Sequence, residues 1–151
     1  MTNVIVILLT FILMEVVAWI MHKYIMHGLF WKFHEDHHTR SNHNSTFEWN
    51  DVFFIFFSIL AITSFLLWKY VNIQIFLGIG IGICLYGLTY FLVHDIFIHQ
   101  RVKVFRNTKN PYLRALRRAH KIHHKKLTKE DGECFGMLWV PLKYYLAELK
   151  S

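Results

Sequence analysis

Residues 73–93 read IQIFLGIGIGICLYGLTYFLV, and His94 follows this run directly. A helix of that length crosses the roughly 30 Å of a bilayer's hydrocarbon core. Two further apolar runs occupy residues 4–20 and 52–68. Four glycines in the longest run would let a second helix approach closely. The sequence therefore predicts an all-α, multi-pass membrane protein of about three spans, and a fourth span near residues 135–146 would have to be short or re-entrant.

The composition agrees with a membrane protein that forms one domain. The chain has 151 residues, of which 54% are hydrophobic and 18% are charged, whereas ordinary soluble domains carry roughly 25% charged residues. This composition excludes a disordered tail and a disulfide scaffold. The first apolar run has no basic residues before it and no small-residue cleavage site, so we interpret it as a retained anchor. We expect residues 1–151 to form a single membrane-embedded domain.

The charge of the chain is concentrated in its C-terminal part. Residues 94–151 hold thirteen Lys/Arg and five Asp/Glu, a net charge of +8, and residues 1–93 hold four and five, a net charge of −1. No nucleic-acid-binding motif accompanies this basic region, so lipid headgroups or an acidic protein are the expected partners. Because basic loops stay inside, residues 21–51 and 94–151 are predicted to be cytoplasmic and the N-terminus to lie outside.

Ten of the eleven histidines fall into four tight groups. Two groups are H-x4-H pairs at the ends of predicted spans, and two are H-x-x-H-H triplets. In chain order the groups are His22 and His27; His34, His37 and His38; His94 and His99; and His120, His123 and His124. The predicted topology places all four at the cytoplasmic boundary of the membrane, as a His-rich helical cap. His43 lies outside the pattern and is left out of the metal-binding set.

The spacings indicate what each group can do. Offsets of three and four place side chains on one helix face, and Asn110 with Pro111 is a typical helix start. One predicted stripe on that helix contains Leu113, Leu116, His120, His123, His124 and Leu127. An offset of five turns a side chain by about 140° in an α-helix. Each H-x4-H pair must therefore lie at a helix end or a π-bulge, or serve two metals, and Gly28 is a plausible helix terminator.

The number of imidazoles restricts the metal. Zinc normally takes four ligands, and calcium and magnesium prefer oxygen. Two six-coordinate ions with about five imidazoles each would keep positions for an oxygen ligand, which suits redox-active iron. Zinc outranks ferrous iron in intrinsic affinity, so it could replace iron during purification.

These motifs resemble those of the membrane fatty acid hydroxylase/sterol desaturase superfamily of non-haem di-iron enzymes. The superfamily signature alternates H-x3-4-H with H-x2-H-H around membrane spans. Within the superfamily the chain is similar to the bacterial-type β-carotene 3-hydroxylases. The stretches that carry this resemblance are MEVVA (14–18), HKYIMHG (22–28), FEWND (47–51), HDIFIHQR (94–101), AHKIHH (119–124) and FG (135–136).

The resemblance implies an O₂-dependent monooxygenase with two irons, held by the ten grouped histidines, in a bacterial cytoplasmic membrane. It would hydroxylate carbon 3 of both β-ionone rings of β-carotene, giving zeaxanthin through β-cryptoxanthin. Electrons would come from reduced ferredoxin or an equivalent carrier, which the basic tail would attract. The carotenoid would enter from the bilayer. Oligomeric state and the range of carotenoids accepted stay open.

Two acidic residues are candidates for partners of metal-bound imidazoles. Glu15 is an ionisable residue within the first apolar run, where such residues are usually functional. It could accept a hydrogen bond from a metal-bound imidazole or be a polar group in the substrate tunnel, or it is a neutral glutamic acid bonded between helices. Asp95 adjoins His94 and could orient its ring, or it is a plain helix-end charge. Asp51, with Asn50 as competitor, is expected to cap the helix of the second span.

Three other functions compete with this interpretation. The same chemistry could act on another lipid, as in a fatty acid or sterol hydroxylase or desaturase. Residues 34–38 match H-E-x-x-H, the pattern of zinc metalloproteases, but an intramembrane protease leaves most grouped histidines unexplained. A metal carrier or sensor would place ligands in mid-membrane, whereas these groups lie at one edge.

Overall fold

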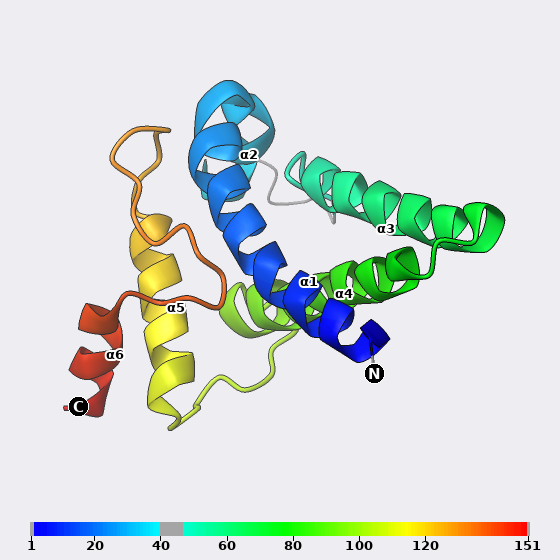
Figure 1. Ribbon diagram of the computed structural model, residues 1–151. Coiled ribbons are helices and arrows are strands. Elements are labelled where there is room, and N and C mark those ends of the chain that lie inside the picture. Colours follow the sequence, from blue (N-terminus) through cyan, green and yellow to red (C-terminus); the bar gives the residue numbers. More distant parts are fainter. Residues whose placement is uncertain (1, 40–46, 151) are drawn as a thin grey trace.

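The computed structural model describes residues 2–39 and 47–150, and this part of the chain is helical without strands. The prediction of an all-α protein is therefore confirmed. Two of the helical segments, η1 and η2, are π-helices that directly continue an α-helix. Figure 1 shows how the α-helices are arranged. In chain order the elements are α1 (Thr2–Ile20), η1 (Met21–Leu29), α2 (Trp31–Thr39), α3 (Asp51–Val71), α4 (Ile75–Tyr90), η2 (Phe91–Ile98), α5 (Pro111–His123) and α6 (Leu142–Leu149).

Three helices in the described ranges are long and apolar enough to cross a membrane, as predicted. They cover Asn3–Leu29, Asp51–Val71 and Ile75–Ile98. The first and third are longer than the apolar runs because each continues through its π-helix into the region of the histidines. Near residues 135–146 the structure has only α6, whose eight residues are too short to span.

Helix α4 is the centre of the membrane region, since it packs against both α1 and α3. Its glycines make this possible on two sides. A Cβ at Gly82 would lie 2.6 Å from the Cβ of Thr10 in α1, and a Cβ at Gly80 would lie 2.8 Å from the ring of Phe65 in α3. Small residues of this kind allow helices to approach closely in a bilayer, where packing rather than water exclusion drives association.

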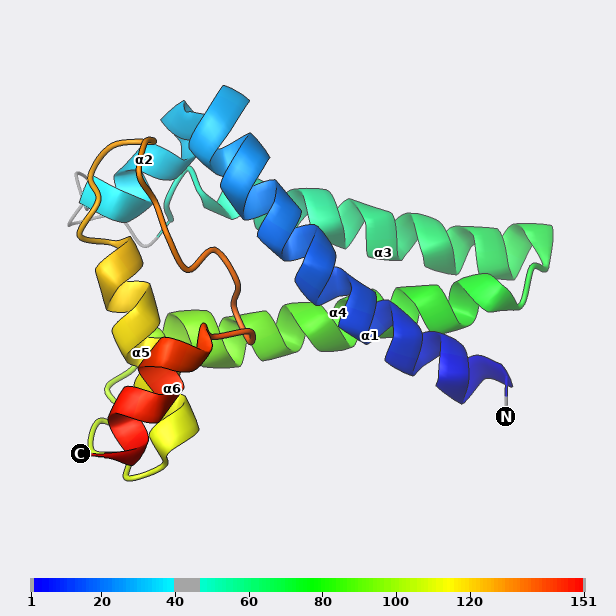
Figure 2. The same ribbon diagram turned by 60° about the vertical axis from the view of Figure 1, so that its left-hand side comes forward.

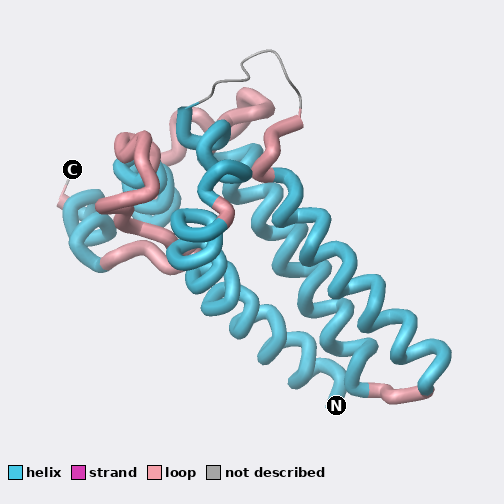
Figure 3. Tube along the Cα trace, turned by 90° about the horizontal axis from the view of Figure 1, so that it is seen from above, coloured by secondary structure: helices cyan, strands magenta, loops and turns pink. Residues whose placement is uncertain are grey.

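The remaining helices form a cap at one end of the spans. Figures 2 and 3 show the N-terminus and the α3–α4 connection at the opposite end from α2, α5 and α6. The C-terminal ends of the first and third spans therefore face the same side as the start of α3, as the predicted topology requires.

Helix α5 starts as the sequence predicts, with the side chain of Asn110 accepting hydrogen bonds from the backbone N–H groups of Tyr112 and Leu113 at 3.0 and 3.1 Å. The prediction for Leu127 was wrong. The helix ends at His123, and Leu127 lies beyond it with an exposed side chain.

We predict that Gly82→Ala destabilises the α1–α4 pair, because the new methyl group would also lie 3.0 Å from the carbonyl oxygen of Ile7. Overpacking against backbone costs about 1–3 kcal/mol, so thermal unfolding in detergent should occur at a lower temperature. Gly87→Ala is the matched control, since its Cβ would meet only Phe54, at 3.9 Å. Equal unfolding temperatures for the two variants would contradict this packing.

Candidate metal centre

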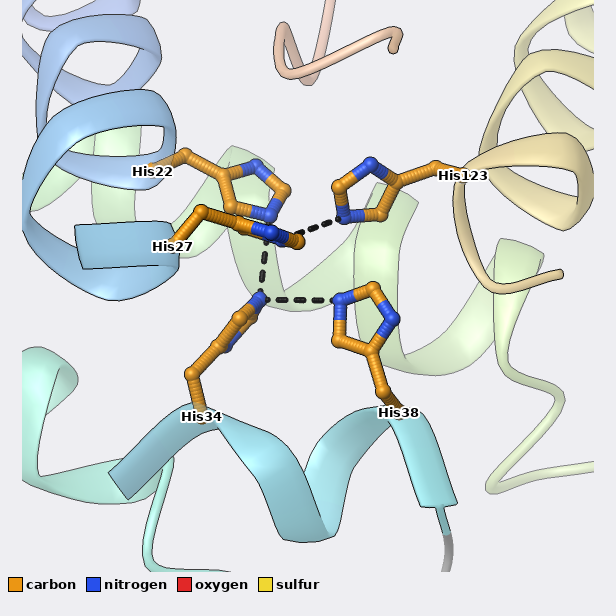
Figure 4. A group of neighbouring side chains, drawn as sticks. All are labelled: His22, His27, His34, His38 and His123. Atoms are coloured by element: carbon orange, nitrogen blue, oxygen red, sulfur yellow. Dashed lines mark hydrogen bonds between the residues drawn. The ribbon is translucent and has the colours of Figure 1, made fainter. Parts of the chain in front are cut away.

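The structure gathers the ten grouped histidines at the end of the spans where α2, α5 and α6 form the cap. Five of them, here called group A, each bring one ring nitrogen within 4.8 Å of the others, and four more form group B by the same criterion. The tenth, His124, has its ring centre 4.5 Å from that of His120 and 4.8 Å from that of His99, both in group B. Group A is His22, His27, His34, His38 and His123 (Figure 4), and group B is His37, His94, His99 and His120.

The two H-x-x-H-H triplets exchange members between the groups. In α2, His34 and His38 belong to group A while His37 belongs to group B. In the second triplet His120 belongs to group B and His123 to group A. On one helix face, offsets of three and four turn a side chain in opposite directions, by about 60° and 40°, so neighbouring members of a triplet can point into different groups. Each triplet therefore bridges both groups, a division that the sequence analysis did not predict.

The H-x4-H pairs lie in the two π-helices. His22 and His27 both lie in η1, and His94 in η2 is followed by His99 as its C-cap. Hydrogen bonds from residue i to i+5 characterise a π-helix, and the backbone N–H of His99 donates to the carbonyl of His94 at 2.9 Å. This geometry lets residues five apart share one face, so each pair serves a single group. Gly28 breaks the helical geometry with φ −121° and ψ −112°, as expected for a terminator.

In group A every Nδ1 faces a neutral oxygen. Four of these acceptors are backbone carbonyls and one is an amide side chain. They are Phe135 O for His22 (2.9 Å), Lys129 O for His27 (3.3 Å), Asn50 Oδ1 for His34 (2.7 Å), Lys126 O for His38 (2.8 Å) and Glu133 O for His123 (2.8 Å). These oxygens only accept hydrogen bonds, so each Nδ1 must carry the hydrogen.

In group B two of the acceptors are carboxylates. The Nδ1 of His37 donates to Glu48 at 2.7 Å, and the Nδ1 of His94 donates to Asp95 at 2.9 Å. Arg101 lies 3.4 Å from the Glu48 carboxylate and 3.8 Å from the Asp95 carboxylate. Burial raises the pKa of Glu48, and Arg101 opposes that rise. Group B is therefore surrounded by charged partners that group A lacks in the described structure.

The inward-facing Nε2 atoms of group A carry lone pairs and no protons. Burial lowers the pKa of His34 well below its usual value, that of His38 to about 4 and that of His123 to about 3. A neutral imidazole carries one N–H, here on Nδ1, so Nε2 is unprotonated. Yet the Nε2 atom of His34 lies 3.1 Å from that of His22 and 3.2 Å from that of His38 (Figure 4). Lone pairs this close repel unless a cation lies between them.

Group B shows a related gap in its hydrogen bonding. Burial lowers the pKa of His37, His120 and His124 below the usual value, and neighbouring imidazoles lower it further. The Nε2 of His124 is buried and has no hydrogen-bond partner among the described residues. Buried polar atoms in native proteins are nearly always paired. Both groups therefore have the donor set of a site for a metal ion that accepts nitrogen ligands.

A largely apolar cavity of about 630 Å³ opens beside the two groups. Residues of all three spans line it, including Met14, Phe57 and Ile83. Imidazoles of both groups also reach its wall, as do Asn50, Asp95 and Arg101. The cavity joins the histidine groups to the part of the molecule that the apolar spans enclose.

Glu15 binds backbone rather than an imidazole. Its Oε1 accepts hydrogen bonds from the N–H groups of Met137, Leu138 and Trp139 at 2.8–3.0 Å, and its Oε2 accepts the hydroxyl hydrogen of Tyr86 at 2.8 Å. The anchored segment begins two residues after Phe135, whose carbonyl orients His22. The carboxylate is thus linked to group A through one stretch of backbone.

Several orienting groups escaped the sequence analysis. Asn50 and Asp51 were expected to compete for a helix cap, but the side chain of Asn50 makes no capping bond and orients His34 instead. Asp51 accepts the backbone N–H of Glu48 at 3.0 Å.

The side chain of Glu35 in the H-E-x-x-H match is exposed, whereas its histidine neighbours are buried. His43 lies outside the described residues.

The chain is similar in sequence to proteins from bacteria and plants. The "Beta-carotene hydroxylase" of Pantoea ananas is 38% identical over 92% of this chain and 78% of its own length. That of Paracoccus sp. (strain N81106 / MBIC 01143) is 32% identical over 93% of this chain and 86% of its own length. The chloroplastic "Beta-carotene 3-hydroxylase 2" of Arabidopsis thaliana is 36% identical over 80% of this chain and 39% of its own length. No solved structure matches the chain.

A family model described as fatty acid hydroxylase matches residues 7–142. The match includes all ten grouped histidines, most of the first apolar helix and all of the other two. The chain belongs to the fatty acid hydroxylase family.

Proposed function

We propose that this protein is an enzyme that hydroxylates the β-ionone rings of β-carotene at carbon 3, giving zeaxanthin through β-cryptoxanthin. The observation that carries the proposal is the apolar cavity that runs between the spans and ends at two groups of imidazoles. The names of the similar proteins from Pantoea, Paracoccus and Arabidopsis support the substrate. The overall reaction takes one atom of O₂ into the C–H bond and releases the other as water, using two electrons and two protons.

We propose that group A together with group B and His124 binds two iron ions, with about five imidazoles for each. Such ligation would leave a coordination position for oxygen. When bound, iron would supply O₂ activation and hydrogen removal from an unactivated C–H bond, which no side chain provides. The protein's residues would fix the ligands through their Nδ1–H bonds, and Asp95 would do this for His94. Zinc is expected only as a purification substitute.

The cavity would hold one end of the substrate. A β-ionone ring is apolar and would displace little bound water from walls formed by Phe57, Ala61 and Ile83. The polyene chain would follow the spans toward the bilayer, from which it enters. The cavity wall at the histidines would place the ring next to the ions and exclude bulk water there.

The other functions fit the geometry less well. In a metalloprotease the glutamate of H-E-x-x-H acts as general base, but Glu35 is exposed and lies between buried ligands without facing them. A metal carrier would not need a large apolar cavity beside its ligands. A hydroxylase or desaturase of fatty acids or sterols would share the site, and only the named relatives favour a carotenoid.

We propose that the cap faces the bacterial cytoplasm and docks the electron donor. The basic region 94–151 carries a net charge of +8, and it supplies α5, α6 and the loops around the histidines. Such a surface suits an acidic donor such as ferredoxin and the anionic headgroups of lipids. The donor would reach the ions from water while the carotenoid reaches them from the bilayer.

The first test of the proposed function is expression in a host that makes β-carotene. Extracted pigments should contain mono- and dihydroxylated carotenoid. His123→Ala should abolish hydroxylation, because His123 is fully buried within group A, while Glu35→Gln, an exposed neighbour of the ligands, should leave it unchanged. Unchanged β-carotene, with wild-type protein in the membrane and donor supplied, would instead favour another lipid substrate.

A second prediction concerns Glu15, which we propose holds residues 137–139 and thereby the carbonyl that orients His22. Glu15→Ala would leave three backbone N–H groups without their acceptor, at about 1–3 kcal/mol for each that is buried. Thermal stability in detergent should fall, and the affinity for iron should fall about 10-fold or more, which lowers iron content after removal of loose metal. Glu15→Gln keeps one accepting oxygen, so its thermal stability and iron binding should lie between those of wild type and of Glu15→Ala. Wild-type stability and iron content in Glu15→Ala would contradict this role.

A third prediction concerns the electron donor. If the basic cap attracts an acidic donor, turnover with limiting purified ferredoxin should fall as ionic strength rises from about 50 to 200 mM, because the Debye length shortens. The same assay with a small uncharged reductant is the control and should respond little. A salt-independent rate with ferredoxin would exclude electrostatic docking.

A further inference from the structure

The two histidine groups differ in the charge of the groups that orient them. All five Nδ1 acceptors of group A are neutral oxygens. In group B, His37 and His94 each donate to a carboxylate, from Glu48 and Asp95. This difference does not follow from the histidine motifs, which are the same for both groups.

We propose that Glu48 and Asp95 are positioning residues that make the group B ion the more easily oxidised of the two. This inference rests on the proposed function, because it requires an iron ion in each group. A carboxylate that accepts the Nδ1–H of an imidazole withdraws that proton partway and makes Nε2 a stronger donor to metal. A carbonyl or an amide oxygen does this less, since it carries no net charge. Stronger donors stabilise the higher charge of an oxidised ion.

Arg101 does not cancel this effect. Its guanidinium lies between three carboxylates, at 3.4 Å from Glu48 and at 3.8 Å from both Asp51 and Asp95. One positive charge facing three negative charges leaves the surroundings of group B negative. Arg101 therefore moderates the donor strength of His37 and His94 and holds the two carboxylates in place.

Two residues of the chain, Glu48 and Asn50, allow the charge to be exchanged between the groups. Glu48 orients His37 of group B, and Asn50, two residues later, orients His34 of group A. Glu48→Gln removes the charge beside group B, and Asn50→Asp adds one beside group A. Both replacements preserve side-chain shape, so each serves as the control for the other.

The test is an anaerobic reductive titration of the ⁵⁷Fe-loaded enzyme in detergent with dithionite, which gives one electron to each ferric ion, followed by Mössbauer spectroscopy. Wild type should show two unequal iron sites. The lower midpoint potential belongs to group B in this proposal, and Glu48→Gln should raise it whereas Arg101→Gln should decrease it further. Asn50→Asp should decrease the higher midpoint potential, that of group A. Glu48→Gln should also weaken the binding of one of the two ions, about 10–100-fold.

The outcomes separate this inference from the proposed function. Shifts of the same sign in Glu48→Gln and Asn50→Asp, or equivalent iron sites in wild type, would overturn the inference while leaving a di-iron enzyme. Wild-type protein that binds fewer than two ions would overturn both. If Glu48→Gln does not fold, the downward shift expected of Asn50→Asp still decides the question, and its absence would refute the proposal.

Discussion

The structure depends on one electrostatic constraint, the convergence of unprotonated imidazole nitrogens in a buried space. In group A oxygen acceptors hold the hydrogen on Nδ1, which directs each Nε2 lone pair inward. Burial lowers the pKa of His34, His38 and His123, so protonation does not relieve their repulsion at neutral pH. A bound cation would relieve the repulsion between these lone pairs. The free energy of metal binding would then add to the free energy of folding.

The helices satisfy this constraint by bringing distant segments to one place. Helix α4 packs against α1 and α3 through its small residues, which fixes the ends of two spans beside each other. The π-helices then turn each H-x4-H pair onto one face. Helices α2 and α5 each contribute histidines to both groups, so each group needs both helices in place. The site is thereby tied to the membrane region and to the cavity between its helices.

The sequence predicts the local features well and the long-range ones poorly. The three spans, the start of α5 at Asn110 and the four histidine groups all follow from composition and helical spacing, which are local. The division of the triplets between two groups depends on how α2 packs near α5, more than 70 residues away. Backbone acceptors such as Lys126 and Phe135 have no sequence signal, because any residue carries a carbonyl. Asn50 looked like a helix cap because its position relative to His34 depends on tertiary structure.

The most direct test of this account counts metal ions and identifies their ligands. Protein reconstituted with iron without oxygen and freed of loose metal should contain two ions per chain, and X-ray absorption should show mainly imidazole nitrogen around both. His27→Ala in group A and His99→Ala in group B should each lower the number of tightly bound ions. One ion or none in the wild-type chain, or ligation mainly by carboxylate oxygen, would contradict the account.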